Sequence, residues 1–254
     1  MLLGQDSIVA LGDTQSDRFW QHLDATKPSF SRDYFDDDWL EQANAVVGMA
    51  SAGRGNTQFL SLDGEELVLR HYKRGGYASK LSANQYLWTG LESARPFHEL
   101  SILVHLVELQ LPVPKPYAAE VVRTGASYSG SLLTYRIPGI TLAEAFVNDK
   151  MTPDLWHRVG STIRLFHDEG ICHADLNAHN IMVRPELSPV SQRSVALLDF
   201  DRASLKDANQ TDWQHKILHR LQRSLLKIAD KNQSGLLEIA WQTVLDGTQG
   251  KPRV

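Results

Sequence analysis

The sequence is poor in the features that mark secreted and membrane-spanning proteins. Its 254 residues include one cysteine, Cys172, so no disulfide can form within the chain, and a reducing compartment is expected. No apolar run approaches the roughly 18 residues that cross a bilayer. The first residues lack a basic segment followed by an apolar one, which predicts that no signal peptide is present. These absences predict a cytoplasmic protein, or one attached to a membrane surface.

The chain also lacks a surplus of positive charge. It carries 26 Lys and Arg against 30 Asp and Glu, a formal net charge of -4. General nucleic-acid binders carry a basic surplus, so this class is excluded. The apolar content of 42% and the charged content of 22% are those of a globular protein with a core. The length allows one large domain or two closely packed lobes.

The most informative stretch is residues 173–180, which follow the pattern H-x-D-x-x-x-x-N and end at Asn180. Downstream, an apolar run over residues 195–198 ends at Asp199. Asp175 would accept the proton of an attacking hydroxyl, while Asn180 and Asp199 offer the hard oxygen ligands that Mg²⁺ prefers. This set is typical of the catalytic loop and the metal-binding Asp of protein-kinase-like phosphotransferases.

The surroundings of this stretch favour a catalytic loop over an ordinary polar turn. An apolar run, residues 181–183, follows Asn180 directly, and the turn-rich segment 184–189 separates it from the second apolar run. We therefore expect two short strands joined by a turn, with the polar residues at their ends.

Residues 46–72 predict a strand, a turn and two further strands. The turn contains Gly53, Arg54 and Gly55, whose glycines would let backbone N–H groups approach phosphate oxygens. A plain hairpin turn is the alternative, because the third glycine of the kinase loop is absent.

The last of these strands carries Arg70 where kinases place the Lys that pairs with nucleotide phosphates. Lys73 is the alternative cation, and a solvated charge on an edge strand is the alternative role for Arg70. Glu99 lies at the start of a helix expected over residues 97–109. It favours the helix dipole there, and we expect it to form an ion pair with Arg70.

Two strand-like runs, residues 117–123 and 131–137, lead to a turn at Pro138 and Gly139, where we place the boundary between two lobes. Thr152 and Pro153 then predict the start of a helix over residues 153–169, with an apolar face that belongs to the core. This helix leads into the catalytic loop.

A further helix is expected over residues 212–230, and a last one over residues 235–245. Four cations fall on one face of the first of these helices, at Lys216, Arg220, Arg223 and Lys227. This face is either a solvated flank or a patch for an anionic lipid headgroup or membrane surface.

Together these elements predict an α+β chain with a two-lobed, protein-kinase-like fold. Residues 1–45 would form an irregular N-terminal extension, in which the acids around Tyr34 and Phe35 make a solvated turn anchored by these two aromatic residues. Residues 46–137 would form a small β-rich lobe with one Glu-bearing helix, and residues 138–254 a larger, mostly helical lobe. No A-P-E sequence follows Asp199, so an activation segment and a protein substrate are not expected.

The sequence resembles the bacterial 3-deoxy-D-manno-octulosonic acid (Kdo) kinases, in the lipopolysaccharide kinase family of the protein-kinase-like superfamily. The resemblance covers residues 45–245, and the forms D-L-N-A-H-N and D-F-D-R are more specific than the general kinase pattern. It is carried by residues 53–55, 68–72, 74–76, 173–180 and 199–202.

The resemblance implies transfer of the γ-phosphate of ATP to the 4-hydroxyl of Kdo on a lipid A precursor, at the cytoplasmic face of the inner membrane. Asp175 would be the base, Asn180 and Asp199 would hold Mg²⁺, and Arg70 with Glu99 would hold the nucleotide phosphates. Asn177 stands where protein kinases carry a Lys that contacts the γ-phosphate, and His179 or Arg202 is expected to compensate.

Three alternatives remain open at this point. The acceptor could be another small hydroxyl compound, such as heptose or an aminoglycoside, because acceptor pockets in this fold have no short motif. The chain could instead be a pseudokinase that binds nucleotide without turnover, although a degenerate site usually lacks one of the three catalytic residues. A purely structural adaptor would leave the catalytic set as a coincidence.

Overall fold

The computed structural model describes residues 8–13, 17–23, 30–50, 57–72, 86–187, 189–191, 194–229 and 234–250. Helices and antiparallel sheets occur together, which confirms the α+β class. The chain divides into two compact units, of which the first comprises Met1–His105 and Pro114–Arg136. The second comprises Leu106–Val113 and Ile137–Val254. We describe each unit separately.

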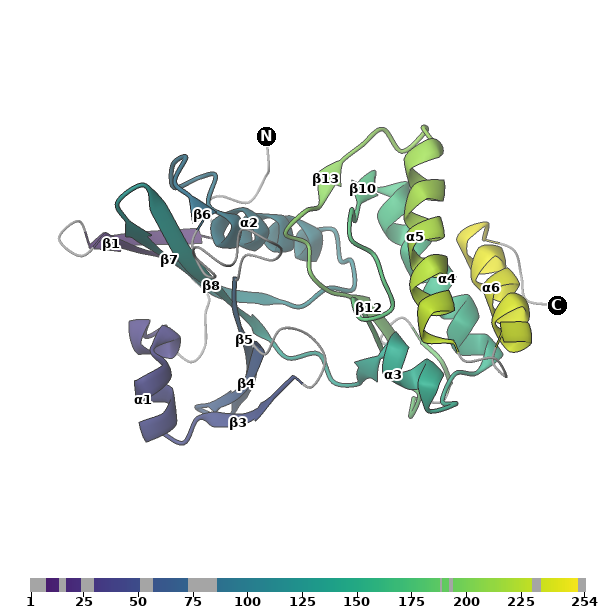
Figure 1. Cartoon of the computed structure of the whole chain (residues 1–254), viewed down its shortest axis with the longest axis horizontal. Helices are drawn as coiled ribbons and strands as arrows, with labels where there is room; N and C mark the ends of the chain where they lie inside the picture. The colour runs from purple at the N-terminus through teal and green to yellow at the C-terminus, as the bar shows by residue number, and fades with distance from the viewer. Residues whose placement is uncertain are drawn as a thin grey trace. The chain divides into compact units, whose positions relative to one another are not determined.

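The first unit is built on an antiparallel sheet with the strand order β1-β2-β7-β8-β5-β4-β3, and β6 pairs with β8 (Figure 1). The strands expected between residues 46 and 72 and between residues 117 and 137 are all present, and β8 begins earlier than expected. The strands are β1 (Ile8–Asp13), β2 (Arg18–Leu23), β3 (Val46–Met49), β4 (Thr57–Leu62), β5 (Glu65–His71), β6 (Tyr86–Leu87), β7 (Pro116–Thr124) and β8 (Ser127–Tyr135).

The N-terminal residues are more ordered than the irregular extension that the sequence predicted. Strand β2 pairs with β7, with Trp20 opposite Glu120, and the Trp20 side chain is buried. The acidic stretch around Tyr34 forms the 3₁₀ helix η2 (Arg32–Phe35) and the helix α1 (Asp37–Gln42). Asp36 caps α1 by accepting hydrogen bonds from the backbone N–H groups of the next turn. The acids are exposed and the side chains of Tyr34 and Phe35 are buried, as expected of a solvated turn with aromatic anchors. The difference from the expectation is that the stretch is helical, and Asp36 supplies the cap of α1.

The side chains of strand β5 point alternately to the two faces of the sheet. Leu67 and Leu69 are fully buried in a cluster with Leu40 of α1, and each such side chain contributes about 1.5–3 kcal/mol to stability. Since successive side chains of a strand point to opposite faces, Arg70 points to the other face. Helix α2 (Arg95–Glu108) meets Arg70 there through Glu99.

Helix α2 begins two residues before the expected start. Pro96 is its second residue, a position that tolerates proline because the first N–H groups of a helix have no partner within it. Glu99 therefore lies one turn inside the helix rather than in its first turn, and an interaction with the helix dipole does not explain its position.

The second unit is mostly helical, with α4, α5 and α6 packed side by side (Figure 1). Its strands form a three-stranded sheet, in the order β12-β11-β9, and the pair β10-β13. The elements are β9 (Ile140–Thr141), α3 (Leu142–Val147), α4 (Pro153–Asp168), β10 (Ile171–Cys172), β11 (Ile181–Val183), β12 (Val195–Leu197), β13 (Ser204–Leu205), α5 (Asp212–Ile228) and α6 (Ser234–Thr248).

Helix α4 forms where the sequence predicted it. The Thr152 side chain accepts a hydrogen bond from the Leu155 N–H, and Pro153 is the first helical residue. Gly160 of α4 and Gly247 of α6 let the two backbones touch. A Cβ atom at Gly160 would lie 2.0 Å from the carbonyl oxygen of Val244, and one at Gly247 would lie 2.3 Å from that of His157. Any larger residue at either position would force the helices apart.

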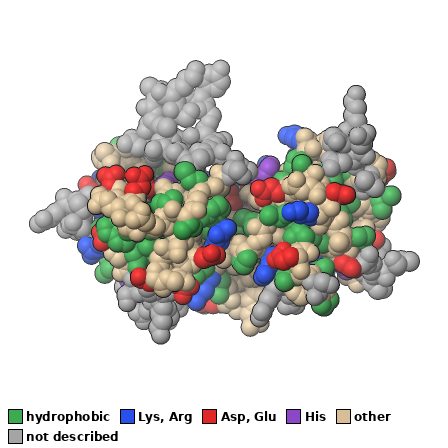
Figure 2. All heavy atoms as spheres, turned by 90° about the horizontal axis from the view of Figure 1, so that it is seen from below, with side chains coloured by type: hydrophobic (Ala, Val, Ile, Leu, Met, Phe, Trp, Pro, Cys, Tyr) green, Lys and Arg blue, Asp and Glu red, His purple; other side chains and the backbone are tan. Residues whose placement is uncertain are grey.

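Helix α5 ends two residues before the expected end, and it buries Ile217, Leu218, Leu221 and Leu225. The four cations of the predicted basic face are all exposed. On the face of the molecule that Figure 2 draws, Lys and Arg side chains lie singly among acidic and apolar ones. Positive charge is therefore not clustered generally on the face that Figure 2 draws.

Within the part of the chain that the structure describes, the helices are all too short or too polar to cross a membrane.

Candidate active site

The predicted catalytic loop, residues 173–180, connects strand β10 to strand β11. Strand β10 pairs with β13, and β11 pairs with both β12 and β9, so both ends of the loop are held by backbone hydrogen bonds. The antiparallel β11–β12 pair is the expected pair of short strands on either side of the turn. Cys172, which precedes the loop, is buried.

The carbonyl oxygen of Asp175 organises the loop from inside. It accepts hydrogen bonds from Nδ2 of Asn177 at 2.9 Å and from Nδ2 of Asn180 at 3.0 Å. The Oδ1 atom of Asn177 accepts a further bond from the backbone N–H of His179 at 2.9 Å. Asn177 is thus occupied in shaping the loop. Because the Nδ2 of Asn180 donates to the backbone, its Oδ1 is the atom left to meet a cation.

Two hydrogen bonds join this loop to the segment that carries Asp199. The carbonyl oxygen of Leu198 lies 2.7 Å from Nε2 of His173, and the N–H of Leu198 donates to the carbonyl oxygen of Asn180 at 2.9 Å. Since a carbonyl can only accept, Nε2 of His173 carries the proton. Burial lowers the pKa of His173, so the ring is neutral at pH 7. These bonds join the loop that carries Asp175 and Asn180 to Leu198, the residue before Asp199.

Asp199 has a left-handed backbone with a φ of 67°. The next residue, Phe200, is fully buried against Phe166 and His173, with ring centroids 5.6 Å and 4.8 Å away. Phe200 points into the core, and the aspartates on either side of it, Asp199 and Asp201, are only partly buried.

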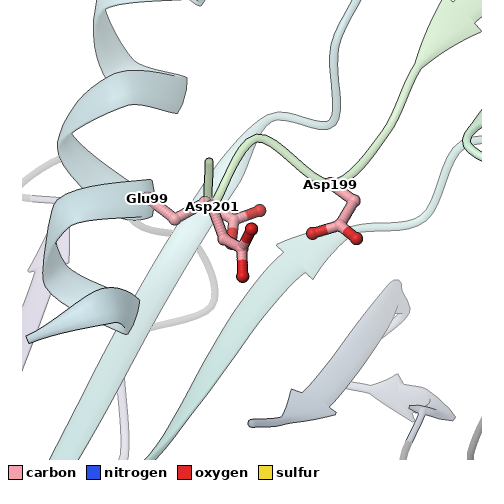
Figure 3. Close-up of side chains that lie close together, drawn as sticks. All are labelled: Glu99, Asp199 and Asp201. Atoms are coloured by element: carbon pink, nitrogen blue, oxygen red, sulfur yellow. The ribbon is translucent and has the colours of Figure 1, made fainter. Parts of the chain in front are cut away.

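The segment after β12 therefore presents two carboxylates from one short stretch. A carboxylate oxygen of Asp199 lies within 4.8 Å of one of Asp201. Figure 3 shows both side chains on this segment, and it shows Glu99 on helix α2. Two neighbouring carboxylates supply hard oxygen donors of the kind that fits Mg²⁺. Asp201 was not among the predicted ligands, and its sequence signal was the acid-Phe-acid spacing.

The Asp175 side chain is held by Arg220, which the sequence placed only on the basic face of α5. Nη1 of Arg220 donates to Oδ1 of Asp175, and the two side chains are 44% and 37% exposed. Helix α5 is also fastened to the loop by Ser224, whose Oγ accepts from the N–H of Ala178 at 3.1 Å. From its position on the basic face, Arg220 was expected to be either a solvated charge or a cation for an anionic lipid or membrane surface. Nothing in its local sequence indicated the contact with Asp175, 45 positions away.

In the first unit, Arg70 and Glu99 form the predicted ion pair. Nη2 of Arg70 and the hydroxyl of Tyr72 both donate to Oε2 of Glu99, and Nη2 also lies 2.9 Å from the Tyr72 hydroxyl. Burial raises the pKa of Tyr72 well above its ordinary value, so the hydroxyl stays protonated and remains a donor. The sequence did not predict the role of Tyr72. Its only signal was its position two residues after Arg70, on the same face of the strand.

The remaining predicted nucleotide-binding residues are Gly53, Arg54, Gly55 and the alternative cation Lys73. They lie outside the residues that the structure describes.

Replacing Arg70 tests the energetic role of the buried pair. Glu99 is only 2% exposed, so Arg70→Met would leave a buried carboxylate without its cation. We expect the free energy of unfolding, measured by urea denaturation, to fall by about 3–5 kcal/mol. The double variant with Glu99→Gln should recover part of this loss because no buried charge is left unpaired.

The exposed pair of Arg136 and Glu66, 3.8 Å apart, supplies the control. Arg136→Met should change the free energy of unfolding by no more than about 1 kcal/mol, because exposed pairs contribute little. Equal effects at Arg70 and Arg136 would mean that the Arg70–Glu99 pair is not a structural element of this unit.

Comparison with known proteins places these features in a family. The model of the lipopolysaccharide kinase (Kdo/WaaP) family matches residues 37–246. A 3-deoxy-D-manno-octulosonic acid kinase of Mannheimia succiniciproducens is 35% identical over 236 residues, which cover 91% of this chain and 95% of that protein.

Two further relatives carry the same name. The one from Photobacterium damsela subsp. piscicida is 37% identical over 82% of this chain and 84% of its own length. The one from Xylella fastidiosa is 38% identical over 75% of this chain and 72% of its own length. The family match spans the Arg70–Glu99 pair, the loop of Asp175 and Asn180, and Asp199, and the chain belongs to the lipopolysaccharide kinase (Kdo/WaaP) family.

Proposed function

We propose that this chain is a Kdo kinase, which transfers the γ-phosphate of ATP to the 4-hydroxyl of a Kdo sugar on a lipid A precursor during lipopolysaccharide synthesis. Membership of the family supports a phosphotransferase that acts on a sugar hydroxyl. The observation that carries the proposal is the hydrogen-bonded system of the second unit, which joins the loop of Asp175 and Asn180 to the residue before Asp199.

In the proposed reaction, Asp175 is the base. The acceptor hydroxyl oxygen forms a bond to the γ-phosphorus, the bond from that phosphorus to the bridging oxygen of ADP breaks, and the hydroxyl proton passes to the Asp175 carboxylate. Oδ1 of Asp175 accepts from Arg220, which leaves Oδ2 to accept this proton. The loop hydrogen bonds run to the backbone of Asp175, so they fix its position without using its side chain.

Magnesium fits the residues present. Bound Mg²⁺ would neutralise charge on the phosphate being transferred, and Asn180 and Asp199, with Asp201 beside them, would hold it. Arg70, oriented by Glu99, would bind the nucleotide phosphates, as would the backbone of residues 53–55. We assign nucleotide binding to residues 46–137 and catalysis to residues 138–254, in the two-lobed kinase manner.

The experiment that tests this function is product analysis by mass spectrometry. Incubation with ATP, Mg²⁺ and a Kdo-bearing lipid A precursor should add a single phosphate, and fragmentation should place it on Kdo. The same lipid without Kdo should remain unmodified. Bound ATP without any product would instead support a pseudokinase or another sugar acceptor.

We also propose that the protein acts at the cytoplasmic face of the inner membrane, held there by the basic face of α5. Each Lys near an anionic surface contributes roughly 1 kcal/mol. Lys216→Glu combined with Lys227→Glu should therefore weaken binding to phosphatidylglycerol vesicles, measured by co-sedimentation, by at least about tenfold. This variant spares Arg220, which contacts Asp175.

The control changes the net charge equally at exposed lysines outside α5, with Lys150→Glu and Lys206→Glu. If both double variants bind the vesicles equally well, the basic face is a solvated flank.

A further inference from the structure

The basic face of α5 runs directly beside the catalytic loop. Its four cations lie at positions 216, 220, 223 and 227, within a sector of roughly 60° around the helix. Asp212 is the single acidic residue of the helix. Ser224, which borders this sector, binds the loop through the N–H of Ala178, and Arg220 reaches the Asp175 carboxylate. The positive charge of α5 is therefore concentrated at the proposed base.

Stability does not account for the contact between Arg220 and Asp175. Both side chains are more than one third exposed, and ion pairs of this kind contribute little to stability because solvent screens them. A guanidinium has five N–H donors in a rigid fork, so Arg220 can bind a second anion while it remains beside Asp175. Because Asp175 would meet the attacking hydroxyl, that second anion would belong to the molecule that carries the hydroxyl.

The chemistry of the acceptor supplies such an anion. The relatives are named for an octulosonic acid, a sugar that carries a carboxylate. Arg pairs with carboxylates through two parallel hydrogen bonds, a geometry that gives direction as well as binding energy. A neutral heptose would offer no partner to Arg220, and a cationic aminoglycoside would be repelled by the α5 face.

We propose that Arg220 binds the carboxylate of the acceptor sugar and thereby selects an acidic acceptor at the catalytic loop. This rests on the proposed function. In the free protein Arg220 pairs with Asp175. When the acidic sugar binds, the guanidinium keeps its bond to Oδ1 of Asp175 and turns other donors toward the sugar carboxylate, so that the sugar hydroxyl is held at Oδ2. The single arginine thus links recognition of the acceptor to its position at the base.

The test is a cycle that combines a change in the enzyme with a matched change in the substrate. Wild type and Arg220→Met are assayed in detergent micelles with the Kdo-bearing lipid A precursor and with its carboxyl methyl ester. For the acid, Arg220→Met should raise the KM of the acceptor and lower kcat/KM by roughly 10–100-fold. Wild type should lose a similar factor on the ester. With the ester, the kcat/KM of the variant should be only slightly below that of wild type. The KM for ATP should stay unchanged.

Controls separate this role from a structural one. Arg220→Lys keeps the charge without the fork and should recover only part of kcat/KM. Lys206→Met, at an exposed lysine outside α5, should behave as wild type with both acceptors. Far-ultraviolet circular dichroism of each variant confirms that the fold is retained.

Two results would overturn the inference. Equal losses for acid and ester in Arg220→Met would mean that Arg220 acts on Asp175 alone. A raised KM for ATP would mean that it binds the nucleotide. In both cases the wild-type enzyme still phosphorylates the acid, so the proposed function survives. Absence of phosphorylation by wild type would instead overturn the function and the inference together.

Discussion

Asp175→Asn should lower the turnover number by roughly 10²–10⁴-fold, the usual contribution of a general base. The amide cannot take the hydroxyl proton, but its Oδ1 can still accept a hydrogen bond from Arg220. The loop should keep its shape because Asn177 and Asn180 bind the backbone carbonyl of residue 175 rather than its side chain. The loss is measured as ATP-dependent phosphorylation of the Kdo-bearing lipid, with thermal melting as the check on the fold.

Asp207→Asn is the matched control for this change. Asp207 is exposed, and its Oδ1 accepts bonds from the backbone N–H and the side chain of Asn209, which an Asn can also accept. Turnover should therefore match that of wild type. A wild-type rate in Asp175→Asn would remove Asp175 as the base and would leave only substrate positioning to this loop.

Asp199→Asn should strongly raise the Mg²⁺ concentration needed for half-maximal activity. Loss of a residue that only hydrogen-bonds to a metal ligand typically costs roughly 10–100-fold in metal affinity, and a change to a proposed ligand itself should cost more. The variant replaces a charged oxygen ligand with a neutral one beside Asp201. Its backbone should be unaffected, because Asn adopts the left-handed conformation at φ 67° as readily as Asp does. The measurement is a Mg²⁺ titration of the initial rate at saturating ATP.

A second aspartate with the same backbone conformation serves as the control. Asp149 has a φ of 53° and is exposed, so Asp149→Asn makes the same chemical change under the same backbone constraint. Its Mg²⁺ titration should overlay that of wild type. If Asp199→Asn also overlays wild type, the metal is held by other groups and Asp199 has a structural role.

The helices and strands that were predicted correctly are marked by sequence signals that lie within a few residues of one another. Helix α4 begins at Pro153 because Thr152 caps it, and both signals are adjacent in the chain. The strands β11 and β12 are short apolar runs on either side of a turn-rich segment, so local pattern was sufficient for them as well. The early start of α2 shows the limit of such signals, since Pro96 is compatible with either side of a helix boundary.

The N-terminal strands show why the rest of the fold was not predictable. Strand β2 has no strong alternation of its own, and it is stabilised by pairing with β7, about 100 residues further along the chain. Whether Trp20 is buried depends on that pairing, which no window of neighbouring residues contains. The acids before α1 were not predictable for the same reason. Their local sequence fits a solvated turn as well as a helix cap, and the choice depends on how the neighbouring aromatic residues pack into the core.

For the site, the sequence alone determined the candidate catalytic residues and their order along the chain. Asp175 and Asn180 lie on one loop, and Asp199 follows β12, the second strand after that loop, so the spacing of the motif is local. Only the tertiary structure decided which remote residues the predicted site residues contact: Tyr72 contacts Glu99, 27 positions away, and Arg220 contacts Asp175, 45 positions away. Such contacts arise when strands and helices that are remote in the chain pack together. Their side chains meet through burial and charge that no local pattern records.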